Sequence, residues 1–195
     1  MHKFISAFVT LSMIFSGFSG ITVLAEEKAV LIYQDNFDDN IFDWPIGWTK
    51  TGGEEAWLEK DEKNGGKMLY LEDNSLFDAV HTRAPKFDVK PGQVYTAMAD
   101  MRCTNTNLML YIRFWNGGEI VYSTYTAAYE SSNWQNIILY ATAPENALQG
   151  EVLFATNTTD LGGGYADNFK VYEGIQSKKE PIQLDPPVQA EAVNA

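Results

Sequence analysis

The most constraining feature of this sequence is a nine-residue segment, Asn107 to Trp115, in which two kinds of side chain alternate without a break. One set is apolar: Leu108, Leu110, Ile112 and Phe114. The other set is Met109, Tyr111, Arg113 and Trp115. A period of two is typical of a β-strand with one buried face. The Asn116-Gly117-Gly118 turn that follows predicts a hairpin into a second strand, from Glu119 to Tyr125.

Similar strand patterns recur along the chain at roughly ten-residue intervals, and amphipathic helices are hard to find. The other expected strands cover residues 29–33, 67–71, 94–102, 134–142, 151–155 and 167–172. The 15 glycines and 7 prolines supply turns between them. Eight or nine strands with this spacing predict an all-β fold, an antiparallel β-sandwich.

The first 25 residues differ in composition from the part that follows. A short basic start precedes an apolar run, and Val23-Leu24-Ala25 stands before two glutamates. This pattern predicts a signal peptide over 1–25, cleaved after Ala25, and therefore a secreted, extracellular protein without membrane insertion. An uncleaved anchor helix is the alternative, although Gly17 and Gly20 interrupt the run.

The last residues, 174–195, contain three prolines and no aromatic side chain. Such a segment buries too little apolar surface to offset the entropy of ordering it. We therefore expect a linker or disordered tail over 174–195. A catalytic domain is one candidate for the part that such a linker would join to this domain. The folded domain is expected to cover 28–173.

The charge balance disfavours one class of partner. The chain has 14 Lys and Arg against 26 Asp and Glu, a net charge of −12. A protein this acidic is repelled by phosphate backbones, so nucleic acid is a poor partner. The single cysteine, Cys103, excludes an internal disulfide and a cysteine-rich zinc site.

Motifs of catalysis are missing from the sequence. There is no G-x-S-x-G, no H-E-x-x-H and no phosphate-binding loop. His81 is the one histidine after the predicted signal peptide, so a Ser-His-Asp triad would depend on it entirely. The acidic residues of 59–62 are expected to form a solvated turn rather than the carboxylate pair of a glycosidase.

Five segments resemble, in order and spacing, bacterial carbohydrate-binding modules of the cellulase-associated, CenC-like jelly-roll type, which have a galactose-binding-domain-like fold. They are Asp35-Asn36-Phe37-Asp38-Asp39 with Gly47-Trp48, Gly66 to Leu71, Lys90 to Tyr95, Trp134 to Pro144, and Tyr165 to Val171. Asp38 stands where that family has Glu, and Asn168 where it has a second Asp. The resemblance covers most of 28–173 and implies a jelly-roll fold and carbohydrate binding.

The resemblance also implies a structural calcium ion that ties the first strand to the last. Asp38 and Asp167 match the family's two carboxylates, and calcium prefers several hard oxygen ligands. The alternative is that these side chains only cap turns through bonds to their own backbone.

The polar side of the 107–115 strand is the candidate sugar-binding surface. Tyr111, Arg113 and Trp115 share that side, with Tyr122 or Tyr125 expected to extend it from the next strand. Aromatic rings stack on sugar C–H faces, and a guanidinium group bonds hydroxyls. The alternative is that these rings fill the core, where Trp48 and Trp134 are expected. The positions of Trp115 and Trp57 stay open.

These observations predict a secreted, non-catalytic carbohydrate-binding module that binds a polysaccharide, with neutral glucan or xylan preferred because of the negative charge. One alternative is a polysaccharide lyase or glycoside hydrolase on the same fold. The other is a structural or adhesion spacer, which would lack an exposed aromatic surface.

Overall fold

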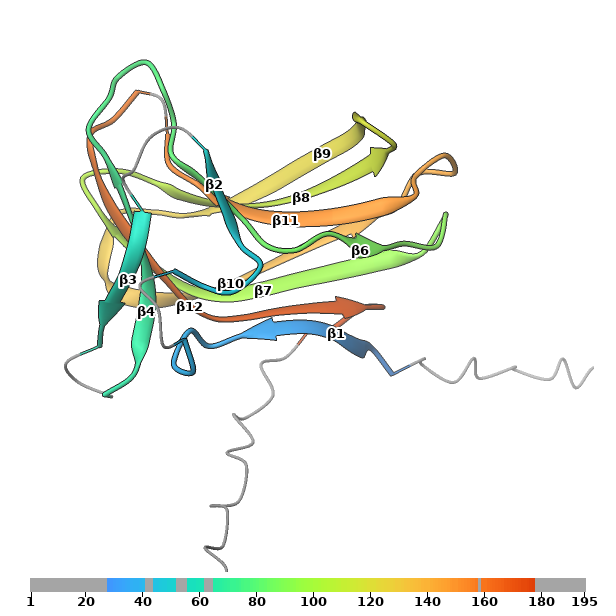
Figure 1. Cartoon of the computed structure of the whole chain (residues 1–195), viewed down its shortest axis with the longest axis horizontal. Helices are drawn as coiled ribbons and strands as arrows, with labels where there is room; N and C mark the ends of the chain where they lie inside the picture. The colour runs from blue at the N-terminus through green and yellow to red at the C-terminus, as the bar shows by residue number, and fades with distance from the viewer. Residues whose placement is uncertain (1–27, 41–43, 52–55, 62–64, 158, 178–195) are drawn as a thin grey trace, which may run out of the picture.

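The structure, a computed structural model, describes residues 28–40, 44–51, 56–61, 65–157 and 159–177. The predicted signal peptide and residues 178–195 of the predicted tail lie outside these ranges. Every regular element within them is a β-strand, and all paired strands are antiparallel. Two sheets stack face to face, with β8, β9 and β11 above β7, β12 and β1 (Figure 1). The predicted antiparallel β-sandwich is confirmed.

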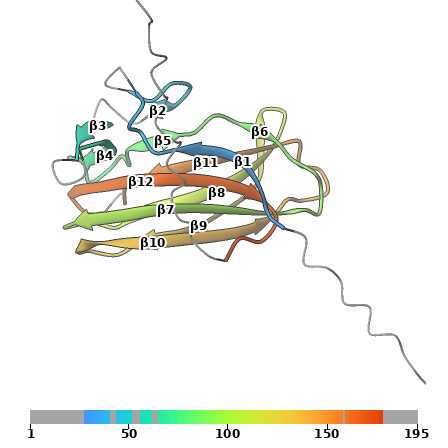
Figure 2. The ribbon, with the colours of Figure 1, turned by 90° about the horizontal axis from the view of Figure 1, so that it is seen from below.

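Sheet A has the strand order β10-β7-β12-β4-β3, and β1 pairs with the end of β12 that β4 leaves free. Its strands are β1 (Val30–Asp35), β3 (Ala56–Lys60), β4 (Lys67–Asp73), β7 (Val94–Thr104), β10 (Ser131–Thr142) and β12 (Gly162–Glu173). Figure 2 shows β1, β12, β7 and β10 side by side. The first and last strands are therefore neighbours, with Val30 opposite Glu173.

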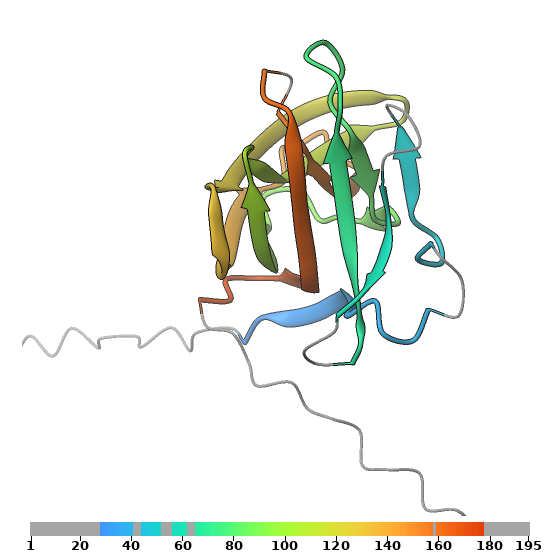
Figure 3. The ribbon, with the colours of Figure 1, turned by 90° about the vertical axis from the view of Figure 1, so that its left-hand side faces the viewer.

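Sheet B has the order β2-β5-β11-β8-β9, and the short β6 pairs with the start of β11. Its strands are β2 (Thr49–Thr51), β5 (His81–Arg83), β6 (Phe87–Asp88), β8 (Leu108–Asn116), β9 (Glu119–Ala128) and β11 (Gln149–Ala155). Figure 3 views one end of the sandwich, where β12, β4 and β3 of sheet A run next to one another.

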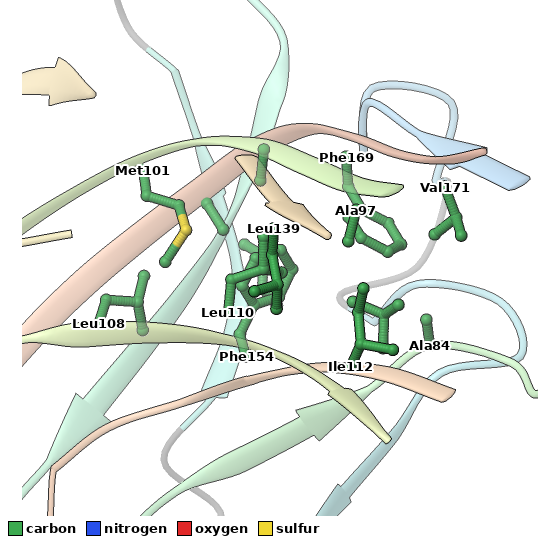
Figure 4. Packing of buried hydrophobic residues seen from close by; sticks show 14 of the residues in the cluster. Ala84, Ala97, Met101, Leu108, Leu110, Ile112, Leu139, Phe154, Phe169 and Val171 are labelled. Atoms are coloured by element: carbon green, nitrogen blue, oxygen red, sulfur yellow. The ribbon is translucent and has the colours of Figure 1, made fainter. Parts of the chain in front are cut away.

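The core fills the space between the inner faces of the two sheets (Figure 4). Sheet A contributes Ala97, Met101 and Phe169, and sheet B contributes Leu110 and Phe154, all buried. Small alanines on β7 let the long side chains of the facing sheet enter, as close packing requires. Each strand thus presents its second face outward, and this outward face is where functional side chains can lie.

The residues that the structure describes form twelve strands, more than the eight or nine expected. The additional strands are β2, β3, β5 and β6, which have two to five residues each. Strands β2, β5 and β6 hold too few residues to display an alternating pattern, whereas the five residues of β3 do alternate, with Ala56 and Leu58 buried. Glu59, expected in a solvated turn, lies on β3 opposite Met68.

Of the two tryptophans expected in the core, one is buried there and the other is not. Trp48 is buried, as expected, whereas Trp134 is 38% exposed on the outer face of sheet A. The Arg102 guanidinium lies over the Trp134 ring, 4.9 Å from its centre, and stabilises this outward position. The Cys103 thiol is free and buried.

The ordered contacts continue slightly beyond the expected end of the domain at 173. The Gly174 amide donates to the Val94 carbonyl, and the Gln176 amide donates to the Thr96 hydroxyl. The start of the predicted tail is therefore part of the folded domain. Among the described residues, no helix is long and apolar enough to cross a membrane.

Candidate functional site: the outer face of sheet B

Strand β8 positions the predicted site residues as its alternation requires. Its apolar side chains, Leu108, Leu110, Ile112 and Phe114, are completely buried against sheet A. Tyr111, Arg113 and Trp115 are half-buried on the opposite, outward face. The structure therefore brings these three predicted residues together on the outer face of sheet B, on β8 between β11 and the edge strand β9.

Strand β9 extends this surface through Tyr125 and not through Tyr122. Tyr125 is directly opposite Tyr111, with ring centres 4.9 Å apart, and is 57% exposed. Tyr122 is opposite Phe114, and its ring stacks on that buried ring at 6.2 Å. Directly paired residues of neighbouring strands share one face of a sheet, so Tyr122 is on the inward face with Phe114. The prediction that Tyr122 joins Tyr111, Arg113 and Trp115 on the outward face is therefore wrong.

On the other side of β8, strands β11 and β5 add charged groups. Glu151 of β11 is directly opposite Arg113 and only 4% exposed. Arg83 and His81 of β5 lie on the same outward face, opposite Leu153 and Ala155. We call the set Tyr111, Arg113, Trp115, Tyr125, Glu151, Arg83 and His81 the sheet B face.

The positive charges of the sheet B face affect one another. Burial lowers the pKa of His81, and the charges of Arg113 and Arg83 lower it further. Burial and the charge of Arg83 also lower the pKa of Arg113, while the Glu151 carboxylate opposes this shift. His81 is therefore neutral at neutral pH and offers one ring N–H donor and one acceptor.

Four polar atoms of the sheet B face are buried and lack a hydrogen-bond partner within the described ranges. They are Arg83 Nε, Arg113 Nε, Trp115 Nε1 and Glu151 Oε2. A buried polar group without a partner costs about 1–3 kcal/mol, so such groups seldom occur in clusters. Three donors and one acceptor on a single face match the mixed hydrogen-bonding capacity of a polyhydroxylated ligand.

Aromatic rings stand next to these polar atoms. The Arg113 guanidinium lies over the Tyr111 ring at 5.4 Å, and the Lys86 ammonium lies over the Trp115 ring at 3.7 Å. The sequence pattern does not identify four members of the sheet B face as site residues, namely Tyr125, His81, Arg83 and Glu151. Tyr125 was an alternative to Tyr122, but Arg83 and Glu151 come from strands that no pattern linked to β8.

The predicted calcium ligands belong to a separate acidic cluster on sheet A, where Asp167 lies on the middle strand β12. The pKa of Asp167 is raised to about 7, first by burial and then by the negative charges of Asp38, Asp100 and Asp61. A divalent cation would relieve this repulsion. No group of three or more His, Cys, Asp or Glu side chains able to hold a metal is present among the residues described, so backbone carbonyls would have to complete the coordination.

No protein-family model matches the sequence, and no curated protein matches it. Solved structures do match. One is the CBM22-1 xylan-binding domain of Paenibacillus barcinonensis Xyn10C, with a TM-score of 0.56 and 12% identity over 76% of this chain and 97% of that one. Another is the Clostridium thermocellum xylanase 10B CBM22-1–GH10 structure with xylohexaose, with a TM-score of 0.51 and 15% identity.

A third match is the enzymatically active domain of bacteriophage CBA120 tailspike protein 4, with a TM-score of 0.54 and 20% identity. The tailspike match includes 66% of this chain and 19% of the tailspike chain. The xylanase match includes 79% of this chain and 30% of the xylanase chain. At sequence identities this low, the matches show a similarity of fold alone. The chain therefore has the jelly-roll β-sandwich fold of carbohydrate-binding modules.

Proposed function

We propose that this protein binds a polysaccharide on the sheet B face without cleaving it. The observation that carries the proposal is the group of four buried, unpartnered polar atoms beside exposed or half-buried rings. Sugar hydroxyls both donate and accept, so one chain can satisfy the guanidinium groups and the Glu151 carboxylate together. The xylan-binding domain among the structural matches has the same fold, which supports this class of ligand.

The surroundings of Glu151 favour binding over hydrolysis. A glycosidase positions two carboxyl groups about 5–10 Å apart across the scissile bond. The sheet B face, as defined above, holds one carboxylate, Glu151. A structural spacer is also disfavoured, because a tyrosine that is 57% exposed and stacked on its neighbour forms the kind of surface a spacer does not need.

We propose a neutral glucan or xylan as the ligand, on the basis of the net charge of −12. The sheet B face itself carries the cations Arg83 and Arg113, with Lys86 beside them. A binding panel should therefore pair a neutral xylan with a xylan bearing glucuronic-acid branches. Stronger binding of the branched xylan would show that the guanidinium groups bind the carboxylates of its glucuronic-acid branches. That result would contradict the neutral-glycan proposal.

Affinity electrophoresis in gels containing soluble xylan or β-glucan tests the function. We expect Arg113→Ala and Tyr125→Ala each to weaken retardation about tenfold or more, as at other binding hot spots. Tyr129→Ala is the matched control, because Tyr129 is 69% exposed at the end of β9, outside the sheet B face. Equal retardation of all three variants would contradict the proposed site, and no retardation of the native protein by any glycan would contradict the function.

The same proposal includes secretion through residues 1–25 and a glycoside-active domain attached through the predicted linker 174–195. The composition of both segments supports them, as does the xylanase match, in which a CBM22 module and a GH10 module occur in one structure. Such a module would hold an enzyme close to its insoluble substrate.

We also propose that calcium binds at Asp38 and Asp167 and stabilises the fold. A ligand that binds only the native state adds about 2.7 kcal/mol at a hundredfold excess over Kd. Calcium should therefore raise the melting temperature, and Asp167→Asn should abolish most of the increase. Asp88→Asn, an exposed carboxylate on sheet B, should keep the full response. Identical melting curves with calcium and with a chelator would contradict the proposal.

A further inference from the structure

The outer face of sheet A carries a row of large side chains, one from each of five neighbouring strands. They are Trp57 on β3, Tyr70 on β4, Tyr165 on β12, Arg102 on β7 and Trp134 on β10. Trp57 is directly opposite Tyr70, Tyr70 opposite Tyr165, and Tyr165 opposite Arg102. On β10, Gln135 pairs with Met101, which places Trp134 beside Arg102. We call this set the aromatic row.

The members of the aromatic row are in continuous contact. The ring centres of Trp57 and Tyr70 are 4.8 Å apart, and those of Tyr70 and Tyr165 are 4.6 Å apart. The Arg102 guanidinium lies 4.5 Å from the Tyr165 ring and 4.9 Å from the Trp134 ring. The row therefore crosses all five strands without a gap.

The Tyr70 ring of the aromatic row lies over the neighbouring strand β12. A Cβ atom built on Gly163 would stand 2.2 Å from the Tyr70 hydroxyl and 2.7 Å from the ring, so this ring covers the Gly163 backbone. A side chain at position 163 would displace the Tyr70 ring. Tyr70 and Tyr165 are half-buried, and Trp134 is 38% exposed, so the row remains accessible from outside.

The aromatic row is one residue wide and, apart from the buried Met68 beside Tyr70 and from Gly163, has polar neighbours on both sides. On one side, Glu72, Gly163 and Thr104 pair in register across β4, β12 and β7. On the other side, Asp167 is opposite Asp100, which is opposite Asn136. A narrow stripe of this kind fits a linear ligand, whereas a stable protein interface needs about 800 Å² on each partner.

The chemistry of the aromatic row matches a neutral glycan chain. Strands lie about 4.8 Å apart, which is close to the length of one sugar residue in an extended β-linked chain. Arg102 Nε is buried and lacks a hydrogen-bond partner in the described part of the chain, so a hydroxyl can satisfy it. Burial raises the pKa of Tyr70, and the charges of Glu72 and Glu59 raise it further; these two carboxylates disfavour a polyanion.

We propose that the aromatic row is a second polysaccharide-binding site, on the side of the sandwich opposite the sheet B face. It goes beyond the proposed function, because either site can exist without the other. With both sites, one domain binds two glycan chains at once and crosslinks them.

Titration calorimetry with xylohexaose and cellohexaose tests the second site through its stoichiometry. We expect two hexasaccharides per native chain, and one per chain for either Trp134→Ala or Arg113→Ala. Tyr140→Ala is the matched control, because Tyr140 lies on the same strand and face as Trp134, is 43% exposed, and stands outside the row. Trp134→Ala should weaken binding at the second site about tenfold or more, and Trp134→Phe should restore part of it.

The outcomes distinguish the two sites. One hexasaccharide per native chain, unchanged in Trp134→Ala and Trp57→Ala, would overturn the second site and leave the first. Binding that survives Arg113→Ala but is lost in Trp134→Ala would support the second site and overturn the sheet B face. No binding of either hexasaccharide by the native chain would overturn both. Melting curves of each variant establish that a lost site does not reflect unfolding.

Discussion

Replacing Trp48 by alanine is expected to lower the free energy of unfolding by about 3–5 kcal/mol, the range for large buried aromatic residues. The Trp48 side chain is 4% exposed and belongs to the hydrophobic core. Its ring contacts Phe154 of sheet B at 5.9 Å and Phe169 of sheet A at 5.4 Å. Alanine would leave a cavity between both sheets, so the melting temperature should fall by about 10 °C or more.

The indole nitrogen of Trp48 contributes separately from its ring. It donates to the Tyr33 hydroxyl at 2.9 Å and to the Asp35 carboxylate at 3.0 Å. Burial raises the pKa of Asp35, and the bond from Trp48 opposes that shift. Trp48→Phe keeps most of the ring contacts and should cost about 1–2 kcal/mol through these bonds alone. Equal destabilisation by both substitutions, measured by denaturant unfolding, would show that packing contributes little.

Asp73→Ala is expected to destabilise the domain by about 3 kcal/mol, because hydrogen bonds to a charged group contribute about 1.5–3 kcal/mol each. Asp73 is completely buried at the end of β4 in sheet A. Its carboxylate accepts from the Thr156 hydroxyl at 2.5 Å and from the Ser75 amide at 3.0 Å. Thr156 follows β11 of sheet B, so this bond joins the two sheets.

The bond between Asp73 and Thr156 also positions the chain that leads into β5. The Val80 amide donates to the Thr156 hydroxyl at 2.9 Å, and the Thr156 amide donates to the Val80 carbonyl at 3.1 Å. Asp73→Asn keeps an acceptor oxygen and should cost clearly less than Asp73→Ala in equilibrium unfolding. Because His81 and Arg83 follow Val80, Asp73→Ala should also weaken binding at the sheet B face. Unchanged stability of Asp73→Ala would contradict a linking role for this carboxylate.

The long strands were predictable because alternation is a local property. In β8 aliphatic or Phe side chains alternate with Met109, Tyr111, Arg113 and Trp115, and buried and half-buried positions alternate in the same order. Tyr111, Arg113 and Trp115 could therefore be placed together from the sequence. Tyr122 could not be placed, because the register shift between Phe114 and Trp115 changes which residues of β9 lie opposite which residues of β8. A hairpin's register depends on such bulges, and the alternation alone does not show them.

Trp134 illustrates a second limit of sequence patterns. Tryptophan is usually buried, which predicts a place in the core. In the structure a cation from another strand, Arg102, lies over its ring and makes the outer face of sheet A favourable. That partner is distant in the sequence, so no local pattern could indicate it.

By itself, the sequence determined the fold class, the faces of the long strands and the acidic character of the chain. Period-two alternation and turn residues depend only on near neighbours, so they can be read without knowing how strands pair. The tertiary structure decided which strands lie side by side. Only that pairing places Glu151 opposite Arg113, and Trp57, Tyr70, Tyr165 and Arg102 in register across sheet A. Both proposed sites consist of residues from several strands, and long-range pairing, which no local segment encodes, brings them together.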